Sequence, residues 1–166
     1  MQILPHGRHA RSSRRTTFSI LILMLVFMLT LFLNVLPAKA SISSPGNQAL
    51  NWAEHYAAGC WYDYGGTSCA QGYDCSGLVS QAFLHGAGIW IGRDTFTQLA
   101  TNGEGHFHQI PLDEARRGDI LFYGTGHEEI DTSWYHMTFG AQEPGTRVGW
   151  HEWSGWWQPT EAFEVW

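Results

Sequence analysis

Apolar residues recur every three or four positions in three stretches of the chain, a pattern that predicts helices. The first stretch is 47–59, the second follows Asp74, and the third is 93–103. Asp74 has a side chain suited to capping the start of a helix, and Gly86 and Gly88 lie where the second helix is expected to end. We therefore predict three helices in this part of the chain.

Later in the chain the pattern changes to short apolar or alternating segments. Segments 120–124, 134–141, 147–153 and 162–166 predict strands. The segment between the first two, "GHEEIDTS" (126–133), is so polar that we interpret it as an excursion between strands. Because helices come first and strands follow, we predict an α+β domain with its helices on one side of an antiparallel sheet.

Residues 1–40 have the pattern of a secretory signal peptide. A basic leader precedes an apolar run (18–36), and the small residues of "AKAS" form a cleavage site before Ser41. The apolar run is also long enough to span a bilayer, so an uncleaved membrane anchor remains an alternative. In either case we expect residues 41–166 to form one domain that lies outside the cytoplasm, either secreted or held at the membrane surface.

The charge of residues 41–166 excludes one class of partner. This part contains four arginines and no lysine against fifteen acidic residues, a formal charge of −11. Such a surface repels phosphate backbones and anionic membranes, so we exclude nucleic acid as a partner. All nine tryptophans lie in the same part and predict either a well-filled core or an aromatic groove. We expect the domain to act as a monomer.

The three cysteines point to a nucleophile. In an oxidising compartment any pairing among Cys60, Cys69 and Cys75 leaves one thiol free. Cys60 and Cys69 flank a glycine-containing loop, and a bridge between them leaves Cys75 free; a bridge that includes Cys75 is the alternative. Cys75 follows Asp74 in the first turn of the second helix, where unpaired N–H groups stabilise a thiolate. We therefore predict that Cys75 is a free, reactive thiol.

A thiolate nucleophile needs a base, and the base needs a partner that orients it. His136 and His151 lie in two successive predicted strands, and pairing across the "EPGT" turn would place both on one face. We therefore predict that His136 and His151 are the two histidines of the site. We interpret His55, His85 and His127 as surface or capping residues.

The segment "HFH" raises the question of a metal site. His106 and His108 share one face of an extended segment, as two metal ligands would. No cysteine or second histidine pair stands nearby at the spacing of a zinc site. We therefore predict no metal and no organic cofactor.

The octamer "GYDCSGLV" (72–79) resembles the nucleophile motif of the NlpC-type family of cell-wall cysteine peptidases. Five further segments resemble other parts of the family in the same order along the chain. They are "YDYGG" (62–66), "RDTFTQ" (93–98), "ARRGDILFY" (115–123), "HMTFG" (136–140) and "GWHEW" (149–153).

This resemblance implies a papain-like fold in which the Cys75 helix packs on an antiparallel sheet. It implies hydrolysis of D-γ-glutamyl-diamino acid bonds in peptidoglycan stem peptides, with Cys75 as nucleophile, His136 as base and His151 as orienting residue. An N-acetylmuramoyl-L-alanine amidase or an acyl transferase on the same scaffold is one alternative. A catalytically silent wall-binding module is another.

The resemblance also implies residues that contact the substrate. It assigns Tyr62, Asp74 and Ser76 to the oxyanion and substrate pocket, where Asp74 would hold the free amino end of the stem peptide. The alternative is that Asp74 only caps its helix. The sequence departs from the family after His136. The family usually has small aliphatic residues here, with a glycine two positions after the histidine, whereas this chain has Met137 and Thr138.

Overall fold

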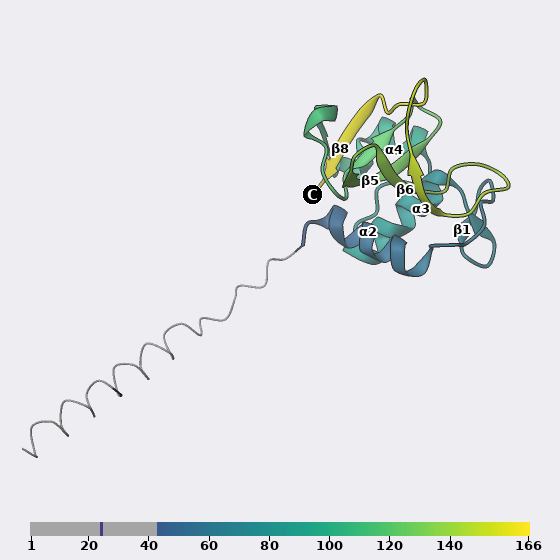
Figure 1. The fold of residues 1–166 in the computed structure, drawn as a ribbon, viewed down its shortest axis with the longest axis horizontal. Helices are drawn as coiled ribbons and strands as arrows, with labels where there is room; N and C mark the ends of the chain where they lie inside the picture. The colour runs from purple at the N-terminus through teal and green to yellow at the C-terminus, as the bar shows by residue number, and fades with distance from the viewer. Residues whose placement is uncertain (1–23, 25–42) are drawn as a thin grey trace, which may run out of the picture. The chain divides into compact units, whose positions relative to one another are not determined.

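In the computed structural model, the described residues are Met24 and residues 43–166 (Figure 1). The predicted signal peptide and the alternative membrane anchor, residues 1–40, lie outside the described residues except for Met24. Among the residues that are described, none of the helices is both long and apolar enough to cross a bilayer. Ile42–Trp166 form one structural unit, which carries the site described below.

The three predicted helices are present. Helix α2 (Pro45–Tyr56) follows the N-cap Ser44, and α4 (Thr95–Thr101) follows the N-cap Asp94. Between them, α3 (Cys75–Ala82) continues into a π-helical turn, η1 (Phe83–Ala87), which Gly88 ends in a left-handed conformation. Short 3₁₀ turns, η2 (Gly103–Gly105) and η3 (Leu112–Glu114), precede and follow the first strand of the main sheet.

The main sheet is antiparallel, with strand order β3-β8-β4-β5-β6-β7. A separate hairpin, β1 (Thr67–Ser68) and β2 (Gly72–Tyr73), directly precedes α3. The strands of the main sheet are β3 (Phe107–Ile110), β4 (Ile120–Phe122), β5 (Glu128–Trp134), β6 (Met137–Gly140), β7 (Gly149–Glu152) and β8 (Glu161–Val165). The α+β class is confirmed.

One element was predicted wrongly. The segment 126–133 is not an excursion between strands, because most of it forms β5, an interior strand of the sheet. Residues 128–132 are all buried, although three of the five are acidic. Ile130 packs in the core, and acidic residues flank it on both sides. Their polarity hides the strand from an analysis of hydrophobic pattern.

The two faces of the sheet are covered differently. Figure 1 shows α2 and α3 lying together against the sheet, and the main core fills this interface with Leu50, Leu78 and Phe139 among its members. On the opposite face Leu121, Tyr123 and Ala162 form a smaller cluster, against which tryptophans of the 153–157 segment pack. Glu129 of β5 lies on this second face, because it pairs with Leu121 of β4.

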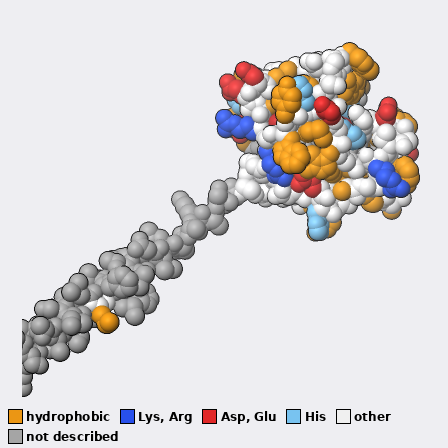
Figure 2. Space-filling view, viewed as in Figure 1, with side chains coloured by type: hydrophobic (Ala, Val, Ile, Leu, Met, Phe, Trp, Pro, Cys, Tyr) orange, Lys and Arg blue, Asp and Glu red, His pale blue; other side chains and the backbone are white. Residues whose placement is uncertain are grey.

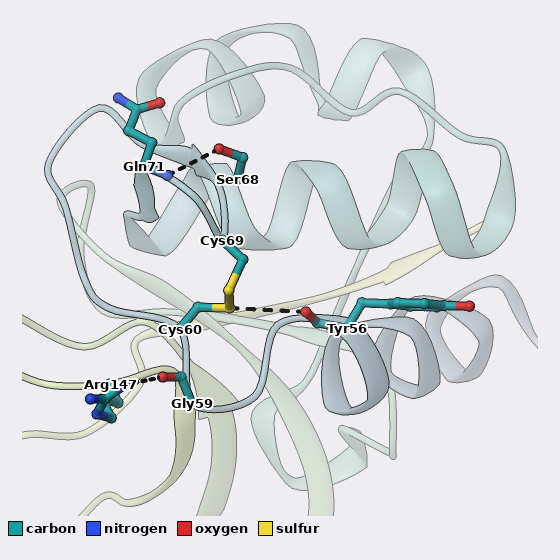
Figure 3. The surroundings of a disulfide bond; sticks show 7 residues. All are labelled: Tyr56, Gly59, Cys60, Ser68, Cys69, Gln71 and Arg147. Atoms are coloured by element: carbon teal, nitrogen blue, oxygen red, sulfur yellow. Dashed lines mark hydrogen bonds between the residues drawn. A yellow bond between two sulfur atoms is a disulfide. The ribbon is translucent and has the colours of Figure 1, made fainter.

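The Cys60–Cys69 disulfide is present and leaves Cys75 as the free thiol among the described cysteines (Figure 3). The bond links Cys60 to Cys69, which directly follows β1, and so closes the loop that precedes α3. Arg147 fixes the same loop from the other side by donating to the carbonyl oxygen of Gly59. The disulfide prediction is therefore confirmed.

Candidate active site

The thiol of Cys75 lies in the first turn of α3 and is buried. The turn is held close to the preceding loop: a Cβ atom at Gly77 would overlap the carbonyl oxygen of Gly66. As the first two residues of the helix, Cys75 and Ser76 have backbone N–H groups without an intrahelical acceptor. The thiol therefore sits where the helix dipole favours negative charge.

The carboxylate of Asp74 is fully occupied by the protein. Its Oδ1 accepts from the backbone N–H of Gly77 (2.6 Å) and the hydroxyl of Ser76 (3.3 Å), and its Oδ2 accepts from the N–H of Gly65 (2.8 Å). Arg93 donates to both oxygens, at 3.2 and 3.0 Å. Five donors already surround a group with about four lone-pair sites. The expectation that Asp74 holds a substrate ammonium is therefore not supported; Asp74 caps α3 and pairs with Arg93.

Tyr62 lies near Cys75. Its backbone N–H donates to Thr146, and it forms an isolated bridge with Tyr73, just before α3. Burial, together with the nearby Cys75 and Asp74, raises the pKa of Tyr62 to about 12. Its phenol therefore keeps its proton at any physiological pH and can donate a hydrogen bond beside the thiol.

His127 is the histidine that the structure places at the thiol. It directly precedes β5, it is buried, and its carbonyl oxygen accepts from the N–H of Tyr123 at 2.9 Å. Burial alone would lower the pKa of His127. The neighbouring Cys75 and Glu129 more than offset burial, so the pKa of His127 rises to about 9. At neutral pH the ring is therefore an imidazolium, and it lies beside Cys75 and Glu129.

Glu129 supplies the carboxylate. Its Oε1 lies 3.4 Å from Nε2 of His127, and its Oε2 accepts from the hydroxyl of Thr138. The residue opposite Glu129 on β6 is Gly140, where a Cβ atom would overlap the carboxyl group. The absence of a side chain at Gly140 thus makes room for Glu129 beside the imidazole.

The structure does not bring His136 to Cys75. His136 lies in the two-residue turn between β5 and β6, with φ 55, rather than within a strand. The centroid of its ring lies 3.9 Å from that of Tyr135 and 4.0 Å from that of Trp153, and the ring stacks on both. These stacking contacts do not include Cys75. The assignment of His136 as base is corrected: β5 extends to Trp134, so the residue expected to open a strand is in the turn.

His151 lies near Glu129 rather than near Cys75. It lies on β7 opposite Thr138, and its Nε2 is 3.2 Å from the carbonyl oxygen of Gly140. The same nitrogen is 4.0 Å from Oε1 of Glu129. His151 therefore lies beside the carboxylate that contacts His127, and Glu129 takes the place predicted for His151.

His127 and Glu129 were both missed by the sequence analysis, although one signal was available. A glycine-rich turn, "GTG" (124–126), begins two residues after the end of β4, and the next residue is His127. Such a turn predicts a hairpin whose returning strand begins at that histidine. The acidic run after His127 favoured a loop instead.

His106 and His108, which we considered as metal ligands, lie near the end of the chain. Among residues 43–166, no group of three or more histidine, cysteine or acidic side chains is placed to hold a metal ion. His106 is 2.9 Å from the carbonyl oxygen of Trp166 through its Nδ1, and His108 stacks on the ring of Trp166. Both histidines thus contact the end of the chain.

Glu128, next to His127, faces the core rather than the site. It is fully buried, both carboxyl oxygens lack a hydrogen-bond partner among the described residues, and burial raises its pKa to about 8. The folded protein therefore holds a proton on Glu128 between about pH 4.5 and pH 8, where the unfolded chain has released it. Stability should fall as pH rises through this window.

We expect Glu128→Gln to remove this loss. The variant should be more stable than the wild type at pH 8 by a few kcal/mol, since each pKa unit corresponds to about 1.4 kcal/mol, and the gain should vanish near pH 4. Urea denaturation at a series of pH values measures it. The exposed Glu143→Gln is the matched control. Parallel stability curves for Glu128→Gln and wild type would contradict the buried, protonated carboxyl.

The fold and the site together define a class of protein. A cysteine at the start of a helix that faces a histidine and a carboxylate on an antiparallel sheet is a papain-like arrangement. The model of the NlpC/P60 family matches residues 59–142, about half of the chain, and the chain belongs to this family.

Individual relatives agree with the family. The peptidoglycan endopeptidase RipB of Mycobacterium tuberculosis is 47% identical over 55 residues, which cover 33% of this chain and 20% of RipB. The NlpC/P60 domain of the peptidoglycan hydrolase SagA has a TM-score of 0.61 at 28% identity, covering 72% of this chain and 98% of that domain. The RipB structure has a TM-score of 0.59 at 25% identity, covering 72% of this chain and 63% of its own.

Proposed function

We propose that this protein is a cysteine peptidase that hydrolyses peptide bonds in peptidoglycan stem peptides. The observation that carries the proposal is the buried thiol of Cys75 beside His127, whose pKa is raised by the thiol and by Glu129. Binding to the cell wall without catalysis would not require a buried thiol beside a charged histidine and a carboxylate. Relatives named as a peptidoglycan endopeptidase and a peptidoglycan hydrolase support the substrate class.

The proposed reaction has two steps. The Cys75 thiolate attacks the scissile carbonyl carbon, and a C–S bond forms. His127 then donates its proton to the leaving nitrogen, the C–N bond breaks, and a thioester remains on Cys75. His127, now neutral, takes a proton from water, which attacks the thioester and releases the acid and the thiolate. Glu129 keeps the ring oriented and stabilises its positive charge.

Two groups are placed to stabilise the oxyanion. The free backbone N–H groups of Cys75 and Ser76 point out of the first turn of α3, where an anion is favoured. The phenol of Tyr62 keeps its proton and adds a further donor. Asp74 acts indirectly, by capping α3 and by fixing Ser76 and Arg93. We propose Tyr62 and Ser76 as substrate contacts and Asp74 as a positioning residue.

We also propose that the protein works outside the cytoplasm. The Cys60–Cys69 disulfide supports an oxidising compartment, because such bonds are rare in the cytosol. The resemblance of "GYDCSGLV" to the family motif supports the bond between D-γ-glutamate and the diamino acid as the target.

Digestion of purified muropeptides, followed by mass spectrometry, tests the proposal. We expect fragments that end in γ-D-glutamate, and no products from Cys75→Ser. Release of complete stem peptides from the sugar would instead identify an amidase. Failure of the wild type to cleave any sugar-linked or sugar-free stem peptide would refute the peptidase proposal.

A further inference from the structure

A pocket that does not include Cys75 or His127 lies on the tryptophan-covered face of the sheet. It is a pocket of about 420 Å³ formed by the β5–β6 turn, β4 and the 153–159 segment. Its walls include the rings of Trp134, Tyr135, His136 and Trp153, and its base includes Leu121. Figure 2 shows that hydrophobic side chains are exposed in clusters beside acidic ones on the visible face of this unit.

The aromatic wall is held in an uncommon backbone conformation. Ser133 and His136 both have positive φ, 60 and 55, although neither is glycine. The ring of His136 lies stacked on Tyr135 and on Trp153, and its carbonyl oxygen accepts from the N–H of Trp153 at 2.9 Å. Positive φ at such residues persists only where the surroundings enforce it, and it is found preferentially at ligand sites.

Polar acceptors lie beside these rings. Asp131 is buried, and its Oδ1 accepts from the N–H of Ser133 at 3.0 Å. The amide nitrogen of Gln158 donates to Gly155, which leaves its carbonyl oxygen available. No lysine or arginine lines the pocket, whereas Asp113 adds a second carboxylate. The pocket therefore favours an uncharged ligand with hydroxyl or amide donors and disfavours an anion.

A sugar ring has both features that this pocket requires. One face of a pyranose presents C–H groups, which pack against aromatic rings, and its edge presents hydroxyl groups, which donate to carboxylate and amide oxygens. A purely apolar ligand would give no hydrogen bond to the acceptor oxygens of Asp131 and Gln158. A cationic ligand would instead bind through the carboxylates of Asp113 and Asp131, and lysine amide is the probe that distinguishes it from the sugar.

The position of the pocket relates it to the proposed active site. Glu129 and Asp131 are alternate residues of β5, so they lie on the same face about 7 Å apart. His127 is four residues from Asp131, or about 13 Å along an extended strand. We propose that the pocket binds a sugar of the glycan chain while the attached stem peptide reaches Cys75, an inference that rests on the proposed function.

The test measures sugar binding without catalysis. The full-length Cys75→Ser protein is titrated with N-acetylglucosamine tetramer, and tryptophan fluorescence and calorimetry report binding. We expect Tyr135→Ala and His136→Gly to weaken binding at least tenfold; glycine suits the φ of position 136, so the turn should be kept. Trp156→Ala is the matched control, because Trp156 is as exposed as Tyr135 (91% and 87%) and lies outside this pocket.

A second readout uses the active enzyme. The ratio of kcat/KM on sugar-linked to sugar-free stem peptide should fall at least tenfold in Tyr135→Ala and stay unchanged in Trp156→Ala. The inference is overturned if the tetramer does not bind, if binding survives both pocket variants, or if lysine amide binds there and the sugar does not. Failure of the proposed function appears separately, as a wild type that cleaves neither substrate.

Discussion

Replacing His127 with alanine is expected to lower kcat/KM on stem peptides by about 10³-fold or more, whereas His136→Ala should stay within about threefold of wild type. His127 is the ring whose pKa responds to Cys75, while His136 stacks on Tyr135 and Trp153 away from the thiol. Steady-state kinetics on a soluble, sugar-free stem peptide measures both variants.

The two variants serve as controls for each other. Both remove one histidine, and circular dichroism with thermal unfolding checks that each remains folded. A severe loss in His136→Ala together with normal turnover in His127→Ala would restore the assignment made from the sequence and refute the one made from the structure.

Replacing Glu129 with glutamine is expected to lower kcat by about 10²-fold and to change the pH profile. The Glu129 carboxylate is one of the groups that raise the pKa of His127 to about 9. His127 carries its proton below this pKa, so wild-type activity should fall as pH rises through about 9. Without the carboxylate the pKa drops, and the alkaline limb should move to lower pH.

The pH profile distinguishes an effect of Glu129 on His127 from a general loss of folding stability. Thr138→Val removes the hydroxyl that donates to Glu129 but keeps the carboxylate, so its alkaline limb should stay near pH 9. An unchanged alkaline limb in folded Glu129→Gln would show that Glu129 does not act on His127.

The part of the site around Cys75 could be predicted from the sequence. The three helices have regular apolar spacing, and Asp74 caps α3 through the N–H of Gly77. The disulfide follows from its short loop, and the free Cys75 follows from the disulfide. These features are local, so nearby residues determine them.

The base half could not be predicted in the same way. Glu128, Glu129 and Asp131 are buried in β5, and their charges resemble those of an exposed loop. They are tolerated there because Glu128 is protonated near neutral pH and Glu129 contacts His127 and Thr138. These compensations come from residues on neighbouring elements, which a pattern along the chain does not reveal.

The role of Asp74 illustrates a second limit. A carboxylate before the nucleophile suggested a partner for the substrate's amino end, and helix capping was the alternative. Arg93 contacts both carboxyl oxygens from nineteen residues away and fills the remaining acceptor sites. Only the arrangement in space shows that this acid is already paired.

The rate at which iodoacetamide alkylates Cys75 near neutral pH tests most directly whether His127 activates the nucleophile. Only the thiolate reacts, and in the proposed mechanism the imidazolium of His127 stabilises it. We predict rapid alkylation in the wild type and in His136→Ala, and a rate at least about tenfold lower in His127→Ala. A wild-type rate in His127→Ala, with slow alkylation in His136→Ala, would contradict the account.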